Sequence, residues 1–144
     1  MIKQFQGEYR WLSNFWPVDI QYQGMVYPSV EHAYMSAKSD NANWKEFCAD
    51  PFTPAGRVKM RSKNVLLVDN WDILKVVVMN DCLIEKFKVP YLREALLATG
   101  DQILQEGNNW GDRFWGVDLR TGEGNNHLGQ ILMAIREQIK IGAL

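Results

Sequence analysis

Apolar positions recur with a helical period along most of this chain of 144 residues. The clearest stretch follows Pro28, where four apolar residues fall at i, i+3, i+4 and i+7: Val30, Ala33, Tyr34 and Ala37. This spacing predicts a helix that buries one face. Ser29 stands just before it and is the expected N-cap, because its side-chain oxygen can accept a hydrogen bond from a backbone N–H of the first turn.

A carboxylate and an amine lie on a neighbouring face of the same predicted helix. Glu31, Met35 and Lys38 share that face, so Glu31 and Lys38 are two turns apart beside the buried stripe. A carboxylate at the edge of a buried face can have a raised pKa and act in acid/base catalysis. The alternative is a first-turn Glu31 that only stabilises the helix dipole.

Further helices are predicted from the same periodicity and from capping residues. Their expected ranges are 44–49, a segment opened by Thr53 as cap and Pro54 as first helical residue, 71–88 after Asn70, 91–99 closed by Gly100, and a last helix capped by Asn126. Two apolar stripes, one of which includes Ile73 and Val77, predict a helix over 71–88 that is buried on much of its circumference. The cations of the segment Arg57–Lys63 either form a solvated face or include one or two phosphate contacts.

Strands are predicted from alternation of apolar and polar residues. Val18–Tyr22 and Met25–Tyr27 flank Gln23-Gly24, which predicts a hairpin with a two-residue turn. The segments 103–107 and 114–119 are also expected as short strands. We therefore predict one α+β domain over residues 1–144, mostly helical, with a small antiparallel sheet built from segments near both ends.

Composition limits the classes of function. The net charge is −1 and the pI is about 6.1, which argues against a protein that grips extended nucleic acid through its phosphates. Cys48 and Cys82 match neither a disulfide framework nor a metal-ligand spacing, so we expect a reduced, cytoplasmic setting without a metal. The start of the chain has no long apolar run, and we expect neither a signal peptide nor a membrane span.

Three places carry groups able to do chemistry. The first holds Glu31 and Lys38. The second is a glycine-bordered turn with Glu106, Asp112 and Trp115, and the third is the start of the last helix, where free N–H groups could hold an anion near Gly124, Asn126 and Gly129. Ser13 and Asn14, set among large apolar residues, form either a buried turn or part of a pocket wall. Six tryptophans in the chain suit a site that stacks flat ligands.

Taken together, several short motifs resemble the NADAR superfamily, also called YbiA-like. The resemblance runs in order from about Phe5 to Arg136, and the motifs that carry it are Leu12-Ser13-Asn14-Phe15, Tyr27-Pro28-Ser29-Val30-Glu31-His32-Ala33-Tyr34 with Lys38, Trp71-Asp72, Asp112 with Trp115-Gly116, Asn126, and Leu128-Gly129 with Leu132-Met133 and Arg136.

The resemblance implies an N-glycosidase that needs no cofactor. It implies acid/base roles for Glu31 and Asp112, and a ligand cleft that includes Lys38, Trp71, Trp115, Gly116, Asn126, Ser13 and Asn14. The expected substrate is a small phosphorylated nucleotide-like N-glycoside of the riboflavin-intermediate type. Removal of ADP-ribose from a nucleobase, or binding of ADP-ribose or NAD without turnover, are the alternatives that remain open. The oligomeric state does not follow from the sequence.

Overall fold

The computed structural model describes residues 1–144, which form two compact units. The central unit is Asn14–Lys86, and the terminal unit joins Met1–Ser13 to Phe87–Leu144. The predicted class, α+β and mostly helical with a small antiparallel sheet, is confirmed. The single domain remains a prediction. No helix is both long and apolar enough to cross a membrane.

The central unit begins with the predicted hairpin. Strands β1 (Ile20–Tyr22) and β2 (Met25–Tyr27) pair antiparallel, with Ile20 opposite Tyr27. The turn residues Gln23 and Gly24 both have positive φ, 51° and 80°, as a two-residue turn of this hand requires. The sequence predicts this element well because its geometry is set locally.

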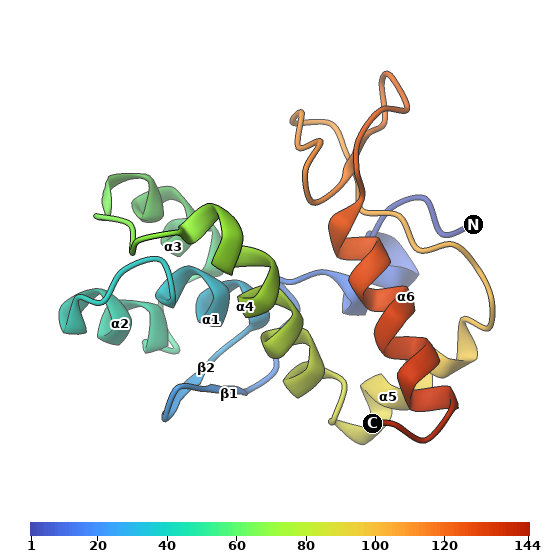
Figure 1. The fold of residues 1–144 in the computed structure, drawn as a ribbon, viewed down its shortest axis with the longest axis horizontal. Coiled ribbons are helices and arrows are strands. Elements are labelled where there is room, and N and C mark those ends of the chain that lie inside the picture. The colour runs from blue at the N-terminus through green and yellow to red at the C-terminus, as the bar shows by residue number, and fades with distance from the viewer. The chain divides into compact units, whose positions relative to one another are not determined.

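Four α-helices and a short 3₁₀ helix complete the central unit: α1 (Val30–Ser36), α2 (Ala42–Ala49), α3 (Ala55–Arg61), η2 (Ser62–Asn64) and α4 (Trp71–Lys86). Helix α1 contacts α2, α3 and α4 (Figure 1). All seven of its residues are buried, including Glu31 and His32. The sequence predicted one buried face, and the additional burial arises because neighbouring helices enclose α1 on several sides.

Two expectations for the central unit are wrong. Thr53 does not cap α3; Pro54 holds the N-cap position, and the Thr53 hydroxyl donates to the Asp50 carboxylate at 3.0 Å instead. In α4, two members of one predicted buried stripe are exposed, Ile73 at 73% and Val77 at 57%, whereas Phe87 at the other end of that stripe is 2% exposed. Periodicity identified these residues as one helix face but could not say whether anything covers that face.

The terminal unit contains η1 (Gly7–Leu12), α5 (Pro90–Ala98) and α6 (His127–Lys140), with two two-residue strands, β3 (Gly107–Asn108) and β4 (Val117–Asp118). Helices α5 and α6 pack together, and Arg136 donates to the Thr99 hydroxyl at 2.8 Å. Strands β3 and β4 pair parallel and form a sheet of their own, separate from the hairpin. The prediction of one sheet from both ends of the chain is therefore wrong, and the strands predicted over 103–107 and 114–119 are much shorter than expected.

Candidate active site

Helix α1 holds Glu31 in place through its first turn. The Ser29 hydroxyl oxygen accepts the backbone N–H of His32 at 3.2 Å, which confirms the predicted cap. The imidazole of His32 is held on both sides: Nδ1 lies 2.6 Å from Ser29 Oγ, and Nε2 lies 2.6 Å from the Thr53 carbonyl oxygen. Because a carbonyl can only accept, Nε2 carries the proton. His32 is thus a structural residue that ties α1 to the start of α3.

The Glu31 side chain is only 6% exposed. Its backbone N–H donates to the carbonyl of Asn14 at 3.0 Å, so the segment that contains Asn14 is fixed to the first turn of α1. The Asn14 amide N–H₂ donates to the Met79 sulfur at 3.5 Å, while its Oδ1 is buried without a hydrogen-bond partner. A buried acceptor left unpaired costs about 1–3 kcal/mol, and such atoms are found where a ligand completes a site.

Lys38 follows α1 and lies within electrostatic reach of Glu31. Its ammonium donates to the Ser62 hydroxyl at 3.3 Å, and that hydroxyl donates to the Lys59 carbonyl at 2.6 Å. Burial lowers the pKa of Lys38 below its usual value, and the charges of Lys59 and Lys75 lower it further, whereas Glu31 opposes these effects. Lys38 is therefore a partly buried cation in a positive surrounding, positioned two turns from the carboxylate.

Trp71, at the start of α4, packs against Tyr34 of α1. Its ring centroid lies 5.3 Å from that of Tyr34, which is one turn from both Glu31 and Lys38. The structure therefore brings Glu31, Lys38, Trp71 and Asn14 to one region of the central unit. Ser13 is the last residue of the first segment of the terminal unit and follows η1, where its N–H donates to the Arg10 carbonyl at 3.0 Å.

Asp112 lies in the terminal unit, in the loop between β3 and β4. Its Oδ1 accepts the backbone N–H groups of Phe114 at 3.1 Å and Trp115 at 2.9 Å. Asn108 holds the loop from the other side, since its amide donates to the Asp112 carbonyl at 2.8 Å and its Oδ1 accepts the Asp112 N–H at 3.0 Å. These bonds fix the carboxylate and direct Oδ2 away from them. Sequence reasoning missed Asn108, although the adjacent pair Asn108-Asn109 is a signal for a turn built on side-chain amides.

Trp115 and Gly116 belong to the same loop. The Trp115 ring packs edge-on against Phe114, with centroids 4.8 Å apart, and His127 of α6 lies against the Phe114 ring at 4.4 Å. Trp115 is half-buried, so part of its ring remains accessible. Gly116 has no room for a side chain, because a Cβ there would stand 2.1 Å from the Glu106 carbonyl oxygen. This close approach places the Trp115 backbone beside β3.

Asn126 holds the N-cap position of α6, as expected, but its side chain makes no capping hydrogen bond. It adopts a left-handed conformation with φ 52°, its Oδ1 accepts the Glu106 N–H at 2.9 Å, and its Nδ2 donates to the Leu104 carbonyl at 2.9 Å. The expectation that free N–H groups at the start of α6 hold an anion is wrong for the first three of them. The backbone N–H groups of Asn126, His127 and Leu128 donate to the carbonyls of Gly116, Phe114 and Trp115. The Asn126 side chain therefore braces the segment just before β3, which carries Glu106, and its backbone N–H bonds to Gly116 at the end of the loop that carries Asp112.

The predicted site residues thus fall into two sets, one in each unit. The central unit holds Asn14, Glu31, Lys38 and Trp71, and the terminal unit holds Ser13, Asp112, Trp115, Gly116 and Asn126. Each set contains one carboxylate and one tryptophan, and hydrogen bonds hold the backbone around each carboxylate. No group of three or more His, Cys, Asp or Glu side chains is arranged to hold a metal ion.

Comparison with known proteins identifies a family across nearly the whole chain. The model of the NADAR domain matches residues 2–140. An N-glycosidase of Nostoc punctiforme is 35% identical, over 92% of this chain and 86% of that protein. The N-glycosidase YbiA of Escherichia coli is 34% identical, over 93% of this chain and 84% of its own length.

Two further matches extend the comparison. A riboflavin biosynthesis protein of Vibrio vulnificus is 38% identical over 90% of this chain, and the chain spans 35% of that longer protein. Among solved structures, the NMR structure of E. coli YbiA superposes with a TM-score of 0.83 at 30% identity, covering 99% of this chain and 89% of that one.

Proposed function

This chain belongs to the NADAR domain family, and we propose that it hydrolyses the ribosyl C–N bond of a small phosphorylated nucleotide-like substrate, of the ribosylamino-pyrimidine type found among riboflavin intermediates. The predicted activity class, a hydrolase acting on N-glycosyl bonds, is confirmed by the relatives named N-glycosidase. The substrate is the part that we infer. Its support comes from the groups around α1 and from two relatives named for riboflavin biosynthesis, one from Vibrio vulnificus and one from maize.

The observation that carries the proposal is the buried carboxylate of Glu31 with the cation of Lys38 two turns away. When the C–N bond breaks, its electron pair leaves with the nitrogen, and positive charge develops on the ribosyl ring. A fixed carboxylate stabilises that charge strongly where water is excluded. Because Glu31 is 6% exposed and fixed in a buried helix, it is preorganised for this role.

The reaction needs one proton removed and one delivered. Water forms the new C–O bond at the anomeric carbon and loses a proton to a carboxylate, while the departing nitrogen gains a proton. We assign the first task to Glu31. Asp112 is the candidate for the second, since Oδ1 is occupied by two backbone N–H groups and Oδ2 is left for a ligand. Trp71 and Trp115 would lie against the base or the cationic sugar.

One phosphate suits the cations of the central unit. Lys38 and the Ser62 hydroxyl are already in contact at 3.3 Å, and Lys59 is close enough to lower the Lys38 pKa. Within the segment Arg57–Lys63, Lys59 is therefore the residue that we assign to the phosphate. The unpaired Oδ1 of Asn14 could accept from a ribose hydroxyl. A net charge of −1 gives little support to binding along an extended nucleic acid.

We place the reaction in the cytoplasm. Both cysteines, Cys48 and Cys82, are free and buried, which suits a reducing compartment. Neither a metal nor an organic cofactor is needed by the chemistry assigned to Glu31 and Asp112.

The decisive experiment measures base release from three substrates: a ribosylamino-pyrimidine phosphate, its dephosphorylated form, and an ADP-ribosylated nucleobase in a DNA strand. We expect the highest kcat/KM for the first, a loss of tenfold or more without the phosphate, and a shallow dependence on salt. Cleavage confined to the ADP-ribosylated strand, with a steep salt slope, would instead establish the alternative activity. Binding of ADP-ribose without any turnover would identify a binding module and contradict the proposal.

A further inference from the structure

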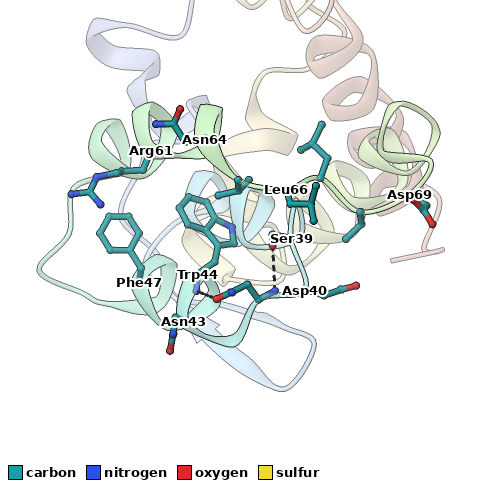
Figure 2. Close-up of a pocket in the computed structure, with 13 residues that line it drawn as sticks. Ser39, Asp40, Asn43, Trp44, Phe47, Arg61, Asn64, Leu66 and Asp69 are labelled. Atoms are coloured by element: carbon teal, nitrogen blue, oxygen red, sulfur yellow. Dashed lines mark hydrogen bonds between the residues drawn. The ribbon is translucent and has the colours of Figure 1, made fainter.

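The central unit contains a pocket that none of the predicted active-site residues lines. It has a volume of about 840 Å³ and lies between α2 and the segment 64–69, which connects η2 to α4 (Figure 2). Pockets of this size are typical of small-ligand sites. The roles proposed for Glu31, Lys38 and Trp71 do not involve this pocket, so its lining is free to recognise a different ligand.

Aromatic rings form one wall of the pocket. The centroids of Trp44 and Phe47 lie 5.7 Å apart with an interplanar angle of 31°. The Trp44 indole N–H donates to the Met35 carbonyl at 2.9 Å, which fixes that ring against α1. The Arg61 guanidinium lies over the Phe47 ring at 5.5 Å. A rigid aromatic wall of this kind favours a planar ligand, because little conformational freedom is lost when a flat ring packs against it.

Charged groups without ion-pair partners stand at opposite sides of the pocket. Figure 2 shows Arg61 beside Phe47 on one side and Asp40 and Asp69 on the other, with Trp44 and Leu66 between them. Arg61 is exposed and forms no ion pair, and neither do Asp40 and Asp69. The pocket therefore offers a forked donor at one end and two acceptors at the other. Guanidinium groups bind phosphate and carboxylate in bidentate geometry, and carboxylates accept from amino and ring N–H groups.

We propose that this pocket binds a planar amino-substituted heterocycle that carries one anionic group, the chemistry of a nucleoside monophosphate. The ring packs against Trp44 and Phe47. The anion pairs with Arg61, and the amino and ring N–H donors face Asp40 and Asp69. The exposed amides of Asn43 and Asn64 line the same pocket and add donors and acceptors for the polar edge of the ring.

An extended peptide is the competing occupant. Leu66 is 88% exposed at the rim, and the backbone groups of Leu66 and Leu67 form no hydrogen bonds within the protein. A peptide would use that backbone edge and would not need opposite charges at the two sides of the pocket. The unpaired charges on either side of an aromatic wall favour the small ligand, and a peptide becomes an outcome of the test.

The test is a titration of the uniformly ¹⁵N-labelled full chain with AMP and GMP, followed by two-dimensional NMR. We expect saturable shifts of Asn43, Trp44 and Leu66 amides, with little change at Glu31. Adenosine, guanosine and inorganic phosphate, each added alone, should bind at least about tenfold more weakly, because each lacks one of the recognised groups. Arg61→Gln should weaken nucleotide binding by about tenfold and leave nucleoside binding unchanged.

Arg57→Gln is the matched control, since Arg57 is an exposed cation of the same helix that does not line the pocket. Nucleotide binding by this variant should stay within twofold of the unmodified chain, and both variants should keep its melting temperature. Several results would overturn the proposal: no binding, shifts confined to Glu31 and Trp71, equal affinity for phosphate alone, equal weakening by Arg57→Gln, or tighter binding of an extended acidic peptide. Loss of base-release activity would bear on the proposed function only, because no residue of this pocket is assigned to it.

Discussion

The carbonyl of Asn14 accepts the backbone N–H of Glu31 at 3.0 Å. This hydrogen bond links the segment that contains Asn14 to Glu31, the residue on which the proposed chemistry depends. The sequence predicted that segment to be either a buried turn or part of a pocket wall. The side chain of Asn14 carries a buried Oδ1 that has no hydrogen-bond partner. The segment around Asn14 is a half-buried turn, and its place in a pocket wall remains a prediction.

Among the site residues, we expect catalytic turnover to depend most strongly on the side chain of Glu31. Glu31→Gln keeps the size and much of the hydrogen bonding but removes the negative charge. We expect kcat to fall about a hundredfold or more, which is the usual effect of losing a general base. Circular dichroism and thermal melting should show an intact fold. Glu46→Gln, on the exposed side of α2, is the control and should keep full activity. Near-normal turnover by folded Glu31→Gln protein would rule out the mechanism.

Lys38 should set the alkaline limit of activity. Its pKa is lowered by burial and by the nearby cations, so its ammonium loses the proton at a lower pH than an ordinary lysine. If the charged form binds the phosphate, kcat/KM for the phosphorylated substrate should decline below pH 10.5, the ordinary lysine value, as the ammonium deprotonates. Lys38→Arg should move this decline to higher pH, since a guanidinium stays protonated.

The dephosphorylated substrate supplies the control for Lys38. Its kcat/KM should lack this alkaline decline, because no phosphate is present to sense the charge. An identical decline for both substrates would assign the titration to another group. The stability of the fold should change with pH in the direction opposite to activity. The unfolded chain holds the Lys38 ammonium proton more tightly than the folded chain does. The contribution of Lys38 to the free energy of unfolding therefore rises with pH between the lowered pKa of the folded chain and the ordinary lysine value.

The local parts of the site could be predicted from the sequence, and the long-range parts could not. The Ser29 cap and the Gln23-Gly24 turn depend on a few adjacent residues, and both are as predicted. The burial of Glu31 on all sides depends on which helices enclose α1. The periodic spacing of apolar residues identifies a helix face but does not show which neighbours cover it. For the same reason it did not predict that Ile73 is exposed.

Asn126 illustrates the same limit in the terminal unit. An Asn before an apolar helix predicts an N-cap, and a local pattern cannot reveal the competing bonds to Leu104 and Glu106, which lie 22 and 20 residues earlier in the sequence. The role of Gly116 was equally hidden, because the carbonyl that excludes a side chain there belongs to Glu106, in the segment that precedes β3. In both cases a long-range contact decided the conformation.

Gly116→Ala should therefore destabilise the terminal unit strongly. The added Cβ would stand 2.1 Å from the backbone oxygen of Glu106, and a backbone carbonyl that already accepts the Val117 N–H cannot move aside as a flexible side chain could. We expect a loss of about 1–3 kcal/mol in the free energy of unfolding or more, measured by urea denaturation. Gly56→Ala is the matched control, since its Cβ meets open space within helix α3, and it should be neutral or stabilising by up to about 1 kcal/mol. Equal stability of the two variants would contradict the observed close approach.

Trp115 should act mainly on binding. Its ring is half-buried beside Phe114, and Trp115→Leu keeps apolar bulk while removing the flat face. We expect substrate or product to bind more weakly by about 1–3 kcal/mol, the range for stacking a base on an aromatic ring. Trp110→Leu, at an exposed position of the same loop, should leave affinity unchanged. If Trp115→Leu unfolds the protein while affinity per folded molecule stays the same, Trp115 is a core residue.

The two buried thiols should make the protein sensitive to alkali and insensitive to thiol reagents. Burial raises the pKa of Cys48 and of Cys82 from 9.0 to about 12, so the native protein holds both as thiols at neutral pH. A thiol-specific reagent at pH 8 should label neither residue until a denaturant is added. Between pH 9 and 10, below the range in which Tyr22 and Tyr27 also contribute, the unfolded chain releases thiol protons that the folded chain retains, and the free energy of unfolding should fall by up to about 1.4 kcal/mol per pH unit for each thiol. Replacing Cys48 with Ala should halve this slope, and a slope that is unchanged by the substitution would assign the alkaline sensitivity to other groups.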